Sequence, residues 1–494
     1  LRAAHAEAGD REQRLAIASR LAVLHSHGAG TAPGIELLAQ ARLEFLDDPG
    51  AVLKIEARMV NVGRGDGGGR RLSLGVAERM RQAADSNPDD GEVLAAAAAE
   101  LVMVAERADR VRDIARLALA RCDAQDEPSV GLAQLVAIRT LIIAEDFETS
   151  EAAVIGALED SRSRGSVLGA VFAAVFYAEL LVRRGHLLAA EAEALSAYKI
   201  ASEHGWPGGI PMLVASMIEV LVERDRLDEA DALLADAGLL APPEELSDQY
   251  TSNVLLAARA RLRAAQEQPS AALADLRECG RREDAWGELN PALIPWRSLA
   301  AEVLGGLGEL QEARALAQQD LARARRFGAP RALGIALRAN ARVTDGPEAE
   351  ALADEACEAL AASGAHLEHA HALADLGQRR IGQGKPEQAR ALLETALELA
   401  DRCGAEALEE RVRTLLRALG TRPRRAQRSG PRSLTPSERQ IALLAARGEP
   451  NRQIAEALFI TQRTVEFHLG NAYRKLGISS RRELSRALAD PAPR

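Results

Sequence analysis

The chain has 494 residues, too many for one hydrophobic core, so its length predicts several domains or an extended array of repeats. Apolar residues make up 47% and aromatic residues only 3%, a balance that favours helices packed through Ala, Leu and Val. The net charge of −10 is uneven, because residues 421–494 hold 15 Arg or Lys against 6 Asp or Glu and so carry +9, leaving −19 on the rest. This asymmetry favours polyanion binding at the C-terminal end only, with a solvated basic tail as the other interpretation.

Cysteine usage and hydropathy argue against a secreted or membrane protein. Cys122, Cys279, Cys357 and Cys403 stand far apart and show no metal-ligand spacing, which predicts small buried residues in a reducing compartment. The sequence has no apolar run of 18 residues and no signal-like N-terminus. We therefore expect a cytoplasmic protein with no membrane partner.

Residues 10–420 repeat a pattern of two amphipathic helices joined by a short turn, as in Leu367 to Ile381, Gly384-Lys385 and Pro386 to Cys403. This pattern predicts about ten tetratricopeptide-like pairs and a final lone helix over 405–419. Such a solenoid offers a long groove for a peptide, a ligand or another part of the chain, and performs no chemistry by itself. The expected turn centres lie near 185, 225, 267, 308, 346 and 384, with weaker candidates at 28–30, 63–69, 106–109 and 146.

The repeat pattern and the local composition together predict three segments. Residues 1–420 are expected to form the repeat domain, 421–432 a flexible basic linker rich in Pro, Gly and Arg, and 433–494 a small helical domain.

The last segment is dense with helix boundary signals. Thr435, Pro436 and Glu438 predict a capping box with proline at the first helical position, opening a helix to about Arg447. Later helices are expected at 451–458, at 464–476 capped by Thr461, and at 481–488 behind a second capping box, 480–483, with the turn of the motif at 459–460. Four short helices in about 55 residues are typical of a helix-turn-helix domain.

Residues 434–484, LTPSERQIALLAARGEPNRQIAEALFITQRTVEFHLGNAYRKLGISSRREL, resemble the LuxR-type DNA-binding domain. The repeats, with the phrases NPALIPWR at 290–297 and RRFGAPR at 325–331, resemble the large ATP-binding LuxR regulators. The resemblance implies a recognition helix at 464–476 in the major groove, a scaffold helix at 451–458 behind it, and a fourth helix that pairs two domains on a palindromic site. Leu484 and Leu488 fit that pairing and simple core packing equally well.

Helical spacing divides the expected recognition helix into two faces. Val465, Leu469, Ala472 and Leu476 would pack inward. Of the outward residues, Phe467 is expected to contact a thymine methyl, Glu466 to accept from a cytosine amino group, and Gly470 to allow close approach. Many members of the family carry Lys or Arg at the positions of Glu466 and Gly470. The expected phosphate contacts are Thr461, Arg463, Thr464, Arg474, Lys475 and Arg481.

Other patterns indicate no site. Gly63 to Gly68 fits G-x-G-x-x-G but follows no strand, so we expect a loose surface loop. His366, His369 and His371 lack the i,i+4 spacing of a helical metal site. The chain holds no P-loop motif and no evident nucleophile and base pair, so we expect no enzyme, no metal and no cofactor in it. The resemblance implies ATP in an upstream ATPase; Leu1 favours a fragment that lacks this part over an alternative start codon.

The sequence thus predicts an all-helical DNA-binding transcription regulator whose repeats sense a ligand or partner. The expected partners are double-stranded DNA, a second copy on DNA, an unidentified inducer or protein, and RNA polymerase as a further candidate. Two alternatives remain: an interaction scaffold with a vestigial DNA-binding domain, and the C-terminal part of an ATP-dependent switch of the STAND class.

Overall fold

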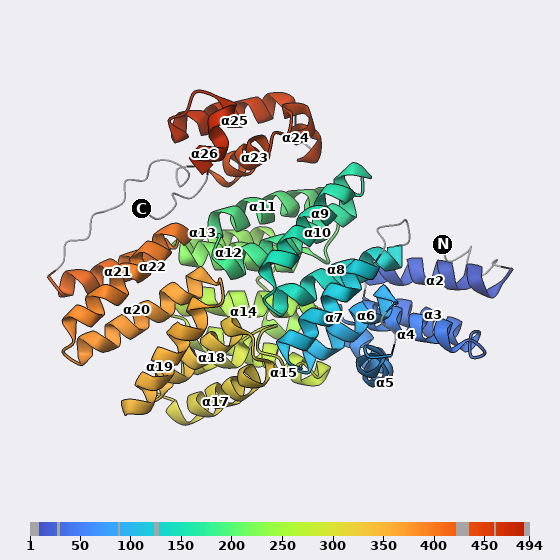
Figure 1. Cartoon of the computed structure of the whole chain (residues 1–494), viewed down its shortest axis with the longest axis horizontal. Coiled ribbons are helices and arrows are strands. Elements are labelled where there is room, and N and C mark those ends of the chain that lie inside the picture. Colours follow the sequence, from blue (N-terminus) through green and yellow to red (C-terminus); the bar gives the residue numbers. More distant parts are fainter. Residues whose placement is uncertain are drawn as a thin grey trace.

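The computed structural model describes residues 9–26, 30–86, 89–122, 128–420, 434–458 and 461–488, and within these ranges every regular element is a helix (Figure 1). The described helices up to residue 420 run as ten consecutive pairs, α2/α3 to α20/α21, followed by the lone helix α22. The predicted all-helical, tetratricopeptide-like architecture is confirmed. Its helices are α2 (Arg11–Ser26), α3 (Ala32–Leu43), α4 (Pro49–Gly63), α5 (Gly67–Ala83), α6 (Gly91–Met103), α7 (Ala108–Arg121), α8 (Pro128–Ile143), α9 (Phe147–Ser163), α10 (Val167–Arg184), α11 (Leu187–Glu203), α12 (Ile210–Glu223), α13 (Leu227–Asp236), the short 3-10 helix η1 (Pro243–Glu245), α14 (Tyr250–Ala265), α15 (Pro269–Trp286), α16 (Trp296–Leu307), α17 (Leu310–Phe327), α18 (Pro330–Val343), α19 (Gly346–Ala361), α20 (His366–Gly382), α21 (Pro386–Cys403) and α22 (Glu406–Ala418).

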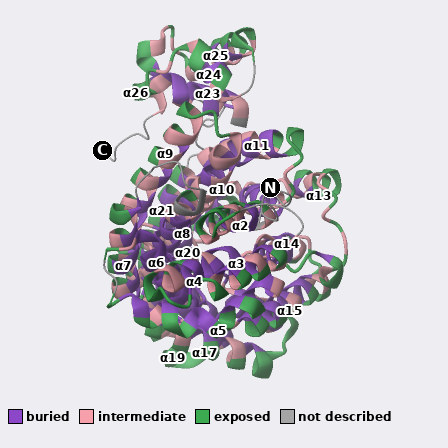
Figure 2. Ribbon diagram, turned by 90° about the vertical axis from the view of Figure 1, so that its right-hand side faces the viewer, coloured by how far each residue is buried: buried purple, intermediate pink, exposed green. Residues whose placement is uncertain are grey.

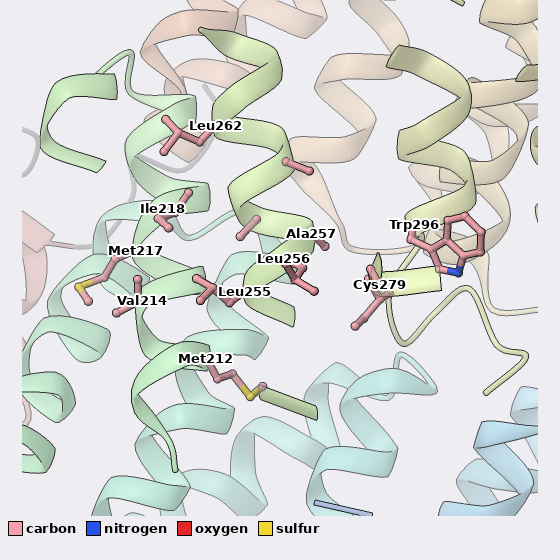
Figure 3. Close-up of a cluster of buried hydrophobic side chains, with 14 of the residues drawn as sticks. Met212, Val214, Met217, Ile218, Leu255, Leu256, Ala257, Leu262, Cys279 and Trp296 are labelled. Atoms are coloured by element: carbon pink, nitrogen blue, oxygen red, sulfur yellow. The ribbon is translucent and has the colours of Figure 1, made fainter. Parts of the chain in front are cut away.

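The core is built from small aliphatic side chains at helix crossings, as the composition predicts. In the largest cluster, α12 contributes Val214 and Ile218, α14 contributes Leu255 and Leu256, and the cluster extends to Cys279 and Trp296 (Figure 3). All four cysteines are buried and none forms a disulfide, as expected. Alanine lets these helices approach closely while leucine fills the spaces between them.

The turn inside most pairs contains a residue with left-handed backbone geometry. Four of these residues are not glycine, so a glycine pattern alone could not have located them. The predicted turn centres at 185 to 384, about 40 residues apart, are confirmed. The residues with positive φ at this place are Ala105, Glu145, Gly185, Asp225, Glu267, Gly308, Gly346 and Gly384.

The repeats curl until early turns meet helices about 186 residues further along the chain. The Glu145 carboxylate, in the α8–α9 turn, accepts hydrogen bonds from the backbone N–H groups of Arg331 (2.6 Å) and Ala332 (2.9 Å) at the start of α18. Beside this contact, the Asn290 side chain donates to the Val102 carbonyl at 2.7 Å. The described repeats therefore contact distant repeats as well as the adjacent ones. The expected long open groove of a one-dimensional stack is not observed, because the repeats form a superhelix whose turns contact each other.

The glycine-rich segment 63–69 is buried, so the expectation of a loose surface loop is wrong. Asp66 caps α5, and its carboxylate also accepts from the Thr31 N–H at 2.6 Å. A Cβ atom at Gly67 would collide with Asp248 and Trp286, which shows why glycine is needed at this position. The segment packs closely between the first repeats and the residues at the start of α14.

Several predicted segments lie outside the described residues. These are the linker at 421–432, the turn of the helix-turn-helix motif at 459–460, and two of the three residues in the candidate turn at 28–30.

The left-handed turns generate a paired stability prediction. Glu267 is exposed at φ +60°, so Glu267→Gly should raise the free energy of unfolding by about 0.5–1 kcal/mol by removing backbone strain. Gly308→Ala, at φ +83° with open space around it, should lower the free energy by about 1 kcal/mol. Urea unfolding followed by the fluorescence of Trp286 and Trp296 would measure both. Shifts of the same sign would contradict the turn assignment.

Candidate nucleic-acid interface

The helices after residue 434 enclose a separate small core. Leu434, Ile441, Ile454, Val465 and Leu484 are all buried in it. Leu484 is fully buried and Leu488 packs against the same cluster, so core packing accounts for Leu484. The elements are α23 (Pro436–Ala446), α24 (Asn451–Ala457), α25 (Gln462–Leu476), the 3-10 helix η3 (Arg481–Glu483) and α26 (Leu484–Leu488).

Helix α25 has one buried and one exposed face. Val465, Leu469 and Ala472 are buried against α23 and α24. The opposite face leaves Phe467 66% exposed, the largest value among the exposed large apolar side chains of the described ranges. Phe467 is thus a large apolar side chain that α25 presents to solvent.

The residues predicted to read bases lie together on this exposed face: Glu466, Phe467 and Gly470 are all exposed. Two predicted phosphate contacts, Arg463 and Arg474, are exposed on the same helix. Arg474 also donates to the Asn471 side chain at 3.0 Å.

The start of α25 is fixed by its cap. The Thr461 hydroxyl accepts a hydrogen bond from the Thr464 N–H at 3.2 Å and lies 2.8 Å from the Thr464 hydroxyl. Thr461 is exposed and Thr464 is half-buried. The positive end of the helix dipole lies at this end of α25, and such a helix end suits a phosphate oxygen.

Two other predicted phosphate contacts have partners within the domain. Lys475 donates to the Glu438 carboxylate at 2.6 Å. Arg481 donates to the Asn451 side chain at 2.7 Å and to the Glu449 carbonyl. Both cations therefore tie helices of the domain together in this structure.

The two expected capping boxes differ in outcome. At α23 the Thr435 hydroxyl accepts from the Glu438 N–H, and the Glu438 carboxylate accepts from the Thr435 N–H at 2.9 Å. The second box is wrong, because the Ser480 hydroxyl donates to the Glu483 carboxylate instead of accepting from its backbone. A 3-10 turn consequently precedes the short α26.

The small domain sits on the repeats through α23, which packs against α11, while α25 lies on the far side (Figures 1 and 2). Gln440 of α23 donates to the Glu193 carboxylate of α11 at 3.4 Å. Burial raises the pKa of Glu193, an effect that the Arg162 and Arg447 guanidinium groups partly oppose. Tyr177 of α10 lies close to Arg447 and Glu193, and we call these three residues together with Gln440 the seat of the small domain. Sequence reasoning missed it, because no local pattern pairs residues about 250 positions apart.

The short helix α24, followed by the amphipathic helix α25 with its exposed face, is typical of a helix-turn-helix domain. Residues 432–488 match the family described as bacterial regulatory proteins, luxR family. This segment of the chain is a LuxR-family helix-turn-helix domain.

The relatives support the same assignment for this segment. An HTH-type transcriptional regulator of Mycobacterium bovis is 41% identical over 88 residues, which cover 17% of this chain and 10% of that protein. The tetrathionate response regulatory protein of Salmonella typhimurium is 49% identical over 53 residues, or 11% and 26% of the two chains. The spore germination protein GerE of Bacillus subtilis is 40% identical over 48 residues, or 10% and 65%. The chain thus covers only a tenth of the length of the mycobacterial regulator.

Among solved structures, the Cut9–Hcn1 complex of the APC/C shows a TM-score of 0.49 and 12% identity, over 81% of this chain and 71% of that one. The repeat architecture rests on the helix pairs described above.

No helix in the described ranges has the length and apolar character needed to cross a membrane. The same ranges contain no group of three or more His, Cys, Asp or Glu side chains placed to hold a metal ion, and His371 instead contacts Glu223 at 2.9 Å.

The capping box makes the stability of the domain depend on pH. Burial alone would raise the pKa of Glu438, but hydrogen bonds from Lys475 and Thr435 lower it below its usual value. Ionised Glu438 therefore stabilises the folded domain fully at pH values above the pKa of an unfolded glutamate, about 4.3. This stabilisation is lost as the pH falls through the lower pKa that Glu438 has in the folded domain. Glu438→Gln should destabilise the domain by about 1–2 kcal/mol at pH 7. Hydrogen exchange of residues 434–446 should show this difference shrinking below pH 4; a difference independent of pH would contradict it.

The seat makes a prediction about domain docking. Glu193→Arg places a cation beside Arg447 and Arg162 and should release the small domain. Hydrogen exchange of residues 177–201 should then rise, and the radius of gyration should increase. Glu358→Arg, on the exposed side of α19, is the matched control. Equal behaviour of the two variants would show that Glu193 does not hold the domain.

Proposed function

We propose that this protein is a DNA-binding transcription regulator that acts in the cytoplasm, with α25 as its recognition helix in the major groove. The observation that carries the proposal is the exposed face of α25, with Phe467 at its centre, in a LuxR-family domain docked so that this face points away from the acidic repeats. Docked in this way, the face can meet a duplex while the negative charge of the repeats stays behind it.

The residues of this face divide into readers and clamps. Phe467 contacts a thymine methyl, Glu466 accepts from a cytosine amino group, and Gly470 lets the backbone approach the bases. Thr461, Arg463, Thr464 and Arg474 contact phosphates. Lys475 and Arg481 approach the backbone from the domain edge and contribute chiefly by holding the helices that carry the readers.

The repeats are the sensing part of the regulator. Their contact with α23 gives a bound ligand or partner a direct mechanical connection to the DNA-binding domain. Two copies bind a palindromic site, with the exposed surface around α26 as the dimer contact and RNA polymerase as a further partner.

Fluorescence anisotropy of the full chain with random duplex and with fragments from its own locus, at two salt concentrations, tests the proposal. Salt-sensitive binding with a preference for some fragments is expected. Absence of binding at low salt, with the domain folded by hydrogen exchange, would favour an interaction scaffold instead.

Two substitutions separate readers from clamps. Phe467→Ala should reduce discrimination at one base pair by about 1–3 kcal/mol while leaving binding to random duplex unchanged. Arg463→Ala should weaken all duplexes alike and reduce the salt slope by about 1. Arg277→Ala, an exposed arginine of α15, is the control. If Phe467→Ala and Arg463→Ala behaved alike on specific and random DNA, the assignment of roles would be wrong.

A further inference from the structure

A cavity of about 460 Å³ lies inside the superhelix, a size typical of small-molecule sites. Helices α4, α8, α10, α12 and α14 contribute to its walls. Most of the lining is apolar, so an occupant needs a hydrocarbon or aromatic body. The apolar side chains include Leu132, Leu135, Phe172, Val175, Phe176 and Met212.

One wall carries charged groups that the protein leaves incompletely satisfied. Arg64, at the end of α4, has a buried Nε with no hydrogen-bond partner and forms no ion pair within the described ranges. Glu288 is only 3% exposed, and one of its carboxylate oxygens has no partner. Arg139, 8% exposed, donates to the Tyr250 hydroxyl and lies 3.3 Å from Glu179. Arg64 and Glu288 are therefore available to a ligand.

The balance of charge on this wall is positive. Arg139 shares the Glu179 carboxylate with Arg183, which lies 2.9 Å from it, so neither arginine has that carboxylate to itself. Burial lowers the pKa of Arg64 to about 10, which still leaves it cationic at neutral pH. Burial raises the pKa of Glu288, and even when it is ionised the guanidinium groups of Arg64, Arg139 and Arg183 outnumber the carboxylates of Glu179 and Glu288. A buried guanidinium without a full counter-charge is unfavourable until an anion supplies one.

We propose that this cavity binds a small organic anion, with its carboxylate at Arg64 and Tyr250 and its apolar body between α8 and α10. The proposal deepens the sensing role given to the repeats and rests on that proposed function for its regulatory meaning. The binding itself is independent of DNA.

The position of the cavity connects it to the small domain. The α9–α10 turn lies between the cavity and a second cleft of about 530 Å³ that Glu449 and Gln453 of the small domain help to line. Ser161, in the last turn of α9, and Ser166, directly before α10, border both spaces. An anion that orders the turn from one side therefore changes the surface on which the DNA-binding domain sits.

Isothermal titration of the full chain tests the proposal with two anions and their neutral counterparts, octanoate with 1-octanol and 1-naphthoate with 1-naphthol. At least one acid should bind tenfold or more tightly than its alcohol, because only the acid neutralises Arg64. Octylammonium should bind more weakly than octanoate. If neither acid is preferred over its alcohol, or nothing binds, the proposal is overturned.

Substitutions locate the charge preference. Arg64→Met should remove it, so that the acid binds no better than its alcohol, whereas Arg64→Lys should retain most of it. Arg325→Met, an exposed arginine of α17, should bind like the unmodified chain. A preference that persists in a folded Arg64→Met variant would overturn the assignment of the site. If that variant does not fold, the ligand series on the unmodified chain decides. Since no DNA is present, failure here leaves the DNA-binding proposal standing, and failure of DNA binding leaves this result unaffected.

Discussion

The hydrogen bonds from α18 to the Glu145 carboxylate, with the neighbouring contact of Asn290 to the Val102 carbonyl, close one superhelical turn of repeats on the next. Each joins groups about 186 residues apart, so each must overcome the entropy of ordering several repeats. Closure gives the array an interior with a cavity, and it fixes α11 as a platform for the small domain. An open solenoid of the same helices would offer neither with defined geometry.

The electrostatic layout follows from this platform. The repeats carry the acidic excess of the chain and the C-terminal segment the basic excess, and the polar groups where α11 meets α23 include Glu193, Gln440 and the nearby Arg447. Helix α25, which carries the exposed Arg463 and Arg474, lies on the side of the small domain away from the repeats (Figure 2). Attraction between the two parts therefore does not consume the cations that a polyanion would need.

Local patterns in the sequence were sufficient for much of the fold. The pairing of helices, the spacing of their turns, the lone α22 and the two faces of α25 follow from periodicity and capping chemistry, which act within a few residues. Three features depend on contacts between distant segments, for which the sequence carries no local signal. They are the contacts between turns of the superhelix, the docking of the small domain on α11, and the close packing around Gly67. The turns near Ala105 and Glu267 were predicted, but their left-handed backbone geometry was not, because it is a conformation that these side chains disfavour. At the nucleic-acid interface the helix positions were predictable, but the internal partners of Lys475 and Arg481 required the folded domain.

The closed superhelix also has a consequence for how such a protein can change over time. Open repeat arrays tolerate gain or loss of a unit, because each unit meets only its neighbours. Here the duplication of one repeat of about 40 residues between Glu145 and Arg331 would bring a different helix end to that carboxylate and move α11 out of step with the helices below it. The number of repeats in this stretch is thus fixed by geometry, and the sequence can diversify by substitution along the cavity wall more readily than by copying whole units.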